Sequence, residues 1–195
     1  MGGTFNPIHM GHLVVAQDAM EKFNFEQVIM MPCAMPPHKR CSKLAPAAHR
    51  IAMVSAAIEG DLKFSVSDLE IERGGYSYAI DTVRELHAIY PEHDINFIIG
   101  SDSLTELHLW KDIYALLEIC EFRIMRRPGD RAVPRKKDIQ LKAPWPGRLL
   151  ANAAIGHLLE ISSSDIRHRV AEGMSIRYLV HPAVEMYIAE HRLYQ

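Results

Sequence analysis

Short apolar runs alternate with stretches of helical periodicity along almost the whole chain. Strands are predicted for residues 27–31, 64–71, 95–99, 122–125 and 158–161, where apolar or alternating residues lie between turn residues. Helices are predicted for residues 10–23, 47–58, 77–90, 112–117, 162–172 and 183–191, whereas residues 131–154 have no clear pattern. Strands that alternate with helices predict an α/β fold: a Rossmann-like, mainly parallel sheet flanked by helices, with further helices at the C-terminus.

The size and charge of the chain narrow the classes of function. At 195 residues the chain suits a single domain, residues 1–195. The formal net charge is only −2, so no overall basic field indicates a nucleic-acid partner. No long apolar run predicts a membrane span, and the N-terminus lacks the basic and apolar parts of a signal peptide. We therefore expect a cytoplasmic protein without a nucleic-acid or membrane partner.

The most specific string is GGTFNPIHMGH, residues 2–12. Gly2 and Gly3 lack Cβ atoms, so their backbone N–H groups can approach a phosphate closely. The helix that follows offers an N-terminal end that favours anions. His9 and His12 are three residues apart and share a face of its first turn, where they could donate hydrogen bonds to phosphoryl oxygens. The string predicts a nucleotide-phosphate site; a metal-binding histidine pair and two surface histidines are the alternatives.

A second string, ISSSDIR at residues 161–167, carries the same chemistry near the other end of the chain. Here a predicted strand runs into Ser162, Ser163 and Ser164 at a helix start, with Arg167 one turn later. Hydroxyl groups and free N–H groups at a helix start can hold phosphate oxygens. The planar guanidinium adds a two-pronged, permanently charged contact. The alternative is an ordinary serine cap with a solvated arginine.

The two strings together resemble the nucleotidylyltransferase superfamily, and within it the bacterial nicotinate mononucleotide adenylyltransferases. The resemblance runs nearly end to end and also includes the strings MPPHK, YSYAIDT, FIIGSD, RRPG and IRYLVHPAV. It implies that the adenylyl group of ATP is transferred to nicotinate mononucleotide, giving deamido-NAD and pyrophosphate. The substrates would be ATP and nicotinate mononucleotide, with Mg²⁺ bound to the ATP phosphates and no dedicated metal site. The oligomeric state is not predicted.

The resemblance also implies a set of site residues. The catalytic positions would be His9, His12, Lys39 and Arg167. The substrate-binding positions would be Gly2, Gly3, Thr4, Phe5, Asn6, Ala79, Gly100, Asp102, Trp110, Arg127, Ser162, Ser163 and Ser164. Of these, Asp102 would accept a hydrogen bond from a ribose hydroxyl, and Trp110 would stack on the pyridine ring. Gly100 and Asp102 follow a predicted strand, where ligands bind in open α/β sheets.

Two departures from the family pattern leave other functions open. The family has an apolar strand ahead of the glycine turn, whereas only Met1 precedes Gly2 here. We therefore expect the first strand to be missing from this chain, and an inactive nucleotide-binding protein remains an alternative. A related adenylyltransferase with another phosphate acceptor is the second alternative. In addition, Ala79 stands where many relatives have Thr, so only its backbone N–H could reach a nicotinate group.

Two weaker patterns suggest a zinc site and RNA binding, and neither is favoured. Cys33, His38, Cys41 and His49 cluster in sequence, but their spacing misses the usual zinc patterns. The basic stretch Arg126, Arg127, Arg131, Arg135, Lys136 and Lys137 could suggest RNA binding, although a solvated face fits the net charge better.

Overall fold

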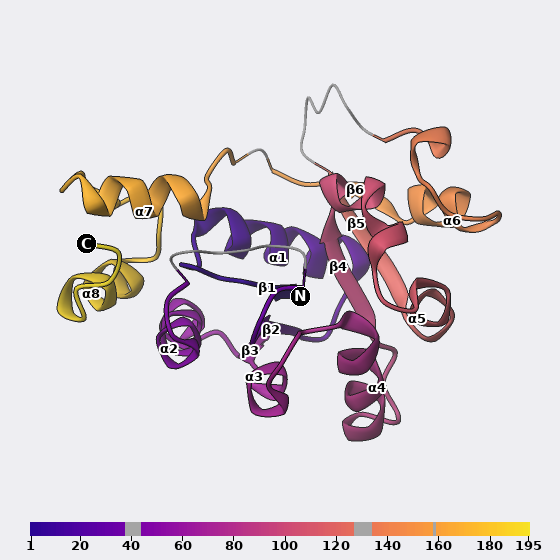
Figure 1. Cartoon of the computed structure of the whole chain (residues 1–195), viewed down its shortest axis with the longest axis horizontal. Coiled ribbons are helices and arrows are strands. Elements are labelled where there is room, and N and C mark those ends of the chain that lie inside the picture. Colours follow the sequence, from indigo (N-terminus) through magenta and orange to yellow (C-terminus); the bar gives the residue numbers. More distant parts are fainter. Residues whose placement is uncertain (38–43, 127–133, 158) are drawn as a thin grey trace.

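The computed structural model describes residues 1–37, 44–126, 134–157 and 159–195. Its strands form two three-stranded parallel sheets (Figure 1). The first has the order β1-β2-β3, from strands β1 (Gly2–Gly3), β2 (Val28–Pro32) and β3 (Phe64–Val66). The second has the order β4-β5-β6, from strands β4 (Asn96–Gly100), β5 (Glu121–Arg126) and β6 (Ala153–Ile155). The predicted Rossmann-like, parallel α/β architecture is confirmed.

Helices connect the strands, as parallel pairing requires. The α-helices are α1 (Met10–Phe23), α2 (Ala47–Ile58), α3 (Leu69–Arg73), α4 (Ala79–Ile89), α5 (Ile113–Ile119), α6 (Trp145–Ala151), α7 (Ser163–Ala171) and α8 (Pro182–Glu190). Three 3₁₀ turns, η1 (Ser101–Thr105), η2 (Leu107–Leu109) and η3 (Lys136–Asp138), complete the described elements. Helices α7 and α8 lie beyond the first sheet and α6 beyond the second (Figure 1). None of the described helices is long and apolar enough to cross a membrane.

Buried side chains form two clusters, because successive strand residues point to opposite faces. In the first cluster α1, α2, α7 and α8 pack on the first sheet, and Ile98 and Met125 reach it from the second sheet. In the second cluster α4, α5 and α6 pack on the other face of β4 and β5, where Ile99, Phe122 and Ile124 point. Helix α1 packs against residues of both sheets and so lies across the place where the two sheets meet.

Three element predictions were wrong in part. The strand predicted at 64–71 ends at Val66, and Leu69–Arg73 form α3, because an alternating pattern this short also suits a helical turn with glutamates at its start. The strand predicted at 158–161 lies earlier, at Ala153–Ile155, where small residues gave a weak signal; residues 159–161 form no strand. Finally, the helix predicted at 77–90 begins at Ala79, and the Ser77 hydroxyl instead accepts a hydrogen bond from the Ala34 N–H at 2.9 Å.

The glycine pair is extended rather than a turn. Gly2 and Gly3 form β1 and pair with Met31 and Pro32 of β2. A Cβ atom on Gly3 would lie 2.9 Å from the Phe5 ring, so glycine permits that ring to fold back over the strand. The turn follows at Phe5, whose φ is +45°, and at the cis Asn6–Pro7 bond. The chain then enters α1 with both motif histidines on its first turn.

Candidate active site

The two histidines of α1 form a stacked pair. Their ring centroids are 3.7 Å apart with an interplanar angle of 26°. The His9 backbone N–H donates to Nδ1 of His12 at 3.3 Å, so a neutral His12 carries its ring proton on Nε2. The edge of the Phe5 ring packs against His12, with centroids 5.0 Å apart. His12 is therefore oriented with a donor nitrogen, Nε2, opposite the nitrogen that anchors it.

The loop before α1 is tied to α7 and to the C-terminal segment that follows α8. Arg167 of α7 donates to the Asn6 carbonyl at 2.7 Å, and the Ser163 hydroxyl donates to the Pro7 carbonyl at 2.9 Å. The buried Asn6 side-chain oxygen accepts from the Ala45 N–H at 3.0 Å and from the Tyr194 hydroxyl at 2.9 Å. Burial raises the pKa of Tyr194, so this hydroxyl remains a donor. The two motif strings, about 150 residues apart in sequence, are thus held together at this loop.

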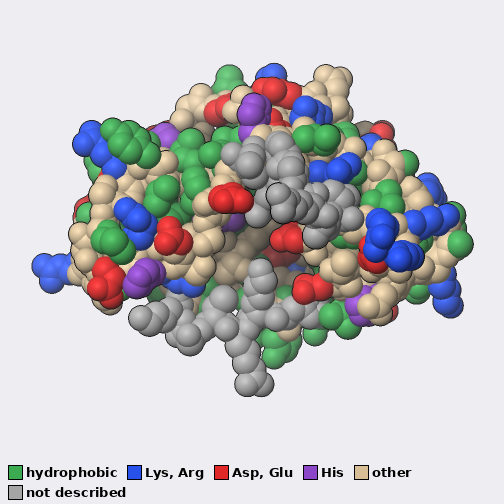
Figure 2. Space-filling model, turned by 90° about the horizontal axis from the view of Figure 1, so that it is seen from above, with side chains coloured by type: hydrophobic (Ala, Val, Ile, Leu, Met, Phe, Trp, Pro, Cys, Tyr) green, Lys and Arg blue, Asp and Glu red, His purple; other side chains and the backbone are tan. Residues whose placement is uncertain are grey.

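A cavity of about 550 Å³ lies between these strings. Its lining includes Thr4, Phe5, Asn6, His9, His12, Asp102, Ser162, Ser163, Ser164 and Arg167. Figure 2 shows that the face seen from above is hollowed near its centre, with backbone and uncharged polar atoms at the floor. A Cβ atom on Gly100 would clash with the Asp102 carboxylate, so glycine there allows that carboxylate to lie over the end of β4. The lining supplies many hydrogen-bond donors, which suits a polyphosphate.

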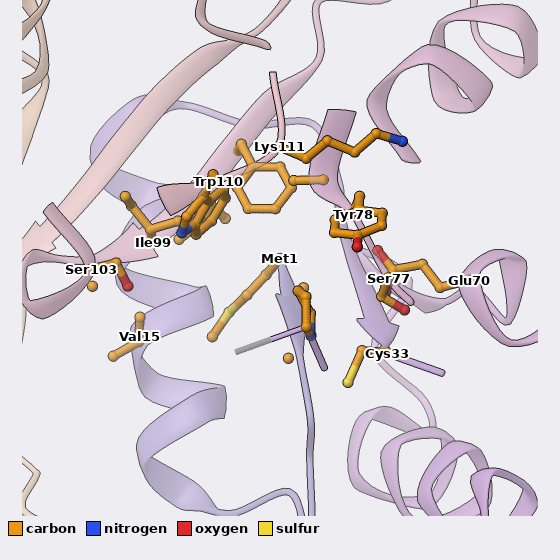
Figure 3. A pocket seen from close by; sticks show the side chains of 17 residues that line it. Met1, Val15, Cys33, Glu70, Ser77, Tyr78, Ile99, Ser103, Trp110 and Lys111 are labelled. Carbon is orange, nitrogen blue, oxygen red and sulfur yellow. The ribbon is translucent and has the colours of Figure 1, made fainter. Parts of the chain in front are cut away.

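A second cavity, of about 270 Å³, adjoins the first at β1 and is mostly apolar (Figure 3). Trp110 lines one wall, held edge-on against Phe97 with ring centroids 5.9 Å apart. Tyr78 and Ala79, at the start of α4, line another wall. The Lys111 ammonium lies 4.7 Å from the Tyr78 ring centroid and 2.9 Å from the Asp81 carboxylate, so it joins the Trp110 segment to α4. The cavity could hold a flat ring with an anionic group at the helix start.

The two cavities meet along β1 and the end of β4. Met1, Gly3, Val15, Gly100 and Ser103 line both of them. Ligands in the two cavities would therefore adjoin near the backbone of Gly3 and Gly100, beside the side chains of Met1 and Val15. This arrangement brings together the sequence-predicted residues from positions 2 to 12, 79, 100 to 110 and 162 to 167.

Some predicted residues lie outside the described part of the chain. They include Lys39 and Arg127, and also His38 and Cys41 of the cysteine and histidine cluster described above. His49, a third member of that cluster, instead has its Nδ1 2.9 Å from the Tyr187 hydroxyl. Within the described residues no group of three or more His, Cys, Asp or Glu side chains could hold a metal ion.

Comparison with known proteins identifies the family of this chain. Residues 1–169 match the family model described as Cytidylyltransferase-like. The chain belongs to this family. Among relatives of this cytidylyltransferase-like chain, a "Probable nicotinate-nucleotide adenylyltransferase" from Desulfitobacterium hafniense (strain Y51) is 42% identical over 197 residues, covering 100% of this chain and 94% of the relative. A protein of the same name from Symbiobacterium thermophilum is 43% identical, covering 100% of this chain and 93% of the relative.

Solved structures show the same fold. The cytidylyltransferase-like chain is similar to Plasmodium falciparum nicotinic acid mononucleotide adenylyltransferase complexed with NaAD, with a TM-score of 0.73 at 21% identity. That match covers 99% of this chain and 94% of the other. A putative nicotinate-nucleotide adenylyltransferase from Vibrio parahaemolyticus gives a TM-score of 0.67 at 22% identity, over 99% of this chain and 91% of the other.

The cytidylyltransferase-like site also contains residues that sequence reasoning missed. Arg50 is almost fully buried and donates to the carbonyls of Thr4 at 3.0 Å and Cys33 at 2.6 Å. It therefore ties the residue that follows β1 to the residue that follows β2. Tyr78 and Lys111 shape the apolar cavity, as described above. Arg126 lines the larger cavity, and its Nε has no hydrogen-bond partner within the described residues. Arg126 had a sequence signal as the first member of the basic stretch, and Tyr78 had one as part of the string YSYAIDT, but neither signal predicted a role in the site.

Proposed function

We propose that this chain transfers the adenylyl group of ATP to nicotinate mononucleotide, giving deamido-NAD and pyrophosphate. The observation that carries the proposal is the meeting of two unlike cavities at Gly3 and Gly100. The larger, donor-rich cavity suits ATP, and the smaller, aromatic cavity suits a pyridine nucleotide. Relatives of about 40% identity over the whole chain are named for the same activity.

The reaction needs no protein base. A phosphate oxygen of the mononucleotide, already anionic at neutral pH, attacks the α-phosphorus of ATP. A new phosphorus–oxygen bond forms, the bond to the β-phosphate bridging oxygen breaks, and pyrophosphate leaves with that electron pair. Nε2 of His12 donates to oxygens that gain charge in the transition state, while Arg167 and Ser162 to Ser164 hold the phosphates. The contribution of the protein is therefore orientation and charge stabilisation.

ATP would enter as its magnesium complex. Mg²⁺ commonly keeps several waters and is held by substrate phosphates with one or two carboxylates. Asp102 lines the larger cavity and is a carboxylate within reach of such a complex. Lys39 and Arg127 would add positive charge, as the resemblance implies. A cytoplasmic location and the absence of a nucleic-acid partner remain predictions.

A panel of acceptors tests the proposal. Pyrophosphate release is measured with ATP and, in turn, nicotinate mononucleotide, nicotinamide mononucleotide and pantetheine phosphate. We expect nicotinate mononucleotide to be preferred over the amide by at least about tenfold in kcat/KM. The first-turn N–H groups of α4, including that of Ala79, can donate to a carboxylate, whereas a carboxamide NH₂ would meet them donor to donor. Equal or greater flux through another acceptor would show that the smaller cavity has been misassigned.

A further inference from the structure

Asp18 and His157 form a pair that the reaction described above does not use. Asp18 lies on α1 and is only 4% exposed. Both of its oxygens contact one residue: Oδ2 accepts the His157 backbone N–H at 2.6 Å, and Oδ1 lies 2.7 Å from His157 Nδ1. Because a carboxylate only accepts, Nδ1 carries a proton and donates it. The imidazole is therefore fixed in orientation, with Nε2 at its outer end.

The backbone beside the pair is shaped for this contact. A Cβ atom on Gly156 would lie 2.7 Å from the Asp18 Oδ2 atom and 3.0 Å from the Met125 methyl group. Any other residue at position 156 would force the backbone or the Asp18 carboxylate to shift. The Gly156 N–H also donates to the Arg126 carbonyl at 3.0 Å, which continues the pairing of β5 and β6. His157 is thus held at the point where the second sheet ends.

The His157 side chain stays 78% exposed although Asp18 holds its ring. Both contacts satisfy the buried carboxylate of Asp18, while most of the imidazole ring stays accessible. His157 lines the larger cavity, together with Met125 and Leu159. An oriented polar group beside apolar side chains is typical of the walls that recognise a ring or a sugar. The phosphate-binding donors of that cavity come from other segments, the loop at 4–12 and the start of α7.

We propose that His157, held by Asp18, is an ATP-binding residue that contacts the adenosine part of the nucleotide through Nε2. Asp18 is its positioning residue. The proposal rests on the proposed function in that it places ATP in the larger cavity. It assigns a share in nucleotide recognition to α1 and to the segment that follows β6, separate from the phosphate contacts of the two motif strings.

The test measures binding without the acceptor. Calorimetry with magnesium-bound ATP and with inorganic tripolyphosphate is carried out on the full chain and on His157→Ala. We expect the variant to bind ATP about tenfold more weakly, as for the loss of a hydrogen bond and ring contact, and tripolyphosphate with unchanged affinity. His93→Ala, an exposed histidine that lines neither cavity, is the matched control and should bind both as the wild type does.

Two results would overturn the assignment of His157. Unchanged ATP affinity in His157→Ala would overturn the proposal, and so would equal weakening for ATP and tripolyphosphate. His157→Asn, which keeps a donor for Asp18 but is too short to replace Nε2, should repeat the loss if the alanine variant melts early. Because the readout is ATP binding, a wild type that binds ATP but makes no deamido-NAD would contradict the proposed function and leave this inference standing.

The role of Asp18 is tested by coupling. Asp18→Asn should weaken ATP binding in the wild-type background and have no further effect on ATP affinity in the His157→Ala background. A merely structural Asp18 would weaken binding by the same factor in both backgrounds, which would overturn its assignment as a positioning residue.

Discussion

The imidazole of His12 is the side chain on which most of the proposed chemistry depends. The His9 N–H contact fixes Nδ1 as an acceptor, and Phe5 fixes the ring plane. We predict that His12→Ala folds but loses about a hundredfold in kcat, because removing one donor to a developing oxyanion costs ~3 kcal/mol. The measurement is steady-state kinetics beside a circular-dichroism melt, with His93→Ala as the control. A kcat within threefold of the wild type would rule out this role for His12.

Residues of this site could be predicted from sequence where their signal is local. His9, His12 and the three serines lie in short strings whose spacing alone places them at helix starts, and the structure brings them to one cavity. Arg50 and Asp18 had no such signal. Arg50 reads as part of an ordinary helix, and its partners Thr4 and Cys33 become neighbours only through the parallel pairing of β1 and β2. Asp18 meets His157 139 positions later.

Elements were predictable where length and periodicity were unambiguous. Helix α1 was predicted with its observed bounds, and the predictions for β4 and β5 differ from the structure by one residue at each end. Periodicity failed at α3 and β6, each of five residues or fewer. In such short segments the choice between helix and strand depends on tertiary contacts. For α3 these contacts involve Glu70, a buried acidic residue that no sequence pattern singled out.

Those contacts attach α3 to the first turn of α4. The buried Thr82 hydroxyl donates to the Glu70 carboxylate at 2.7 Å and accepts from Arg73 at 2.8 Å. Thr82→Val keeps the shape but leaves a buried carboxylate without this donor. We predict a loss of about 2 kcal/mol in the free energy of unfolding, the usual range for an unsatisfied buried group being roughly 1–3 kcal/mol.

Urea denaturation followed by circular dichroism measures this loss. Thr105→Val is the matched control, since Thr105 is exposed and should change stability by less than about 0.5 kcal/mol. If the two variants unfold at the same urea concentration, the contact between Glu70 and Thr82 does not stabilise α3 against α4.

At the scale of the whole molecule, the alternation of strands and helices predicted the parallel topology but not its division into two sheets. Apolar periodicity reports which residues are buried, not which strand lies beside which. The division creates the site, because β1 approaches β4 where Gly2 meets the Phe97 ring, and the two adjoining cavities are both lined by Gly3 of β1 and Gly100 of β4. The C-terminal segment completes the arrangement by bonding Tyr194 to Asn6.

The burial of Cys120 between β4, β5 and α5 gives the whole fold a pH dependence. Burial, with a smaller contribution from the Glu121 carboxylate, raises the pKa of this thiol from 9.0 to about 12. In the unfolded chain the thiol ionises near pH 9, so between pH 9 and 12 the native state binds more protons than the unfolded state. Stability is therefore fully present below pH 9 and falls as the pH rises above it.

We predict that between pH 8 and pH 10 the wild type loses about 1.4 kcal/mol more of its free energy of unfolding than Cys120→Ala does, since one pKa unit corresponds to about 1.36 kcal/mol. Urea titrations of both proteins under reducing conditions at the two pH values give this difference directly. Every other group that titrates in this range is common to the two proteins and cancels in the comparison. Parallel pH dependence of the wild type and the variant would mean that the Cys120 thiol ionises as readily in the folded chain as in the unfolded one.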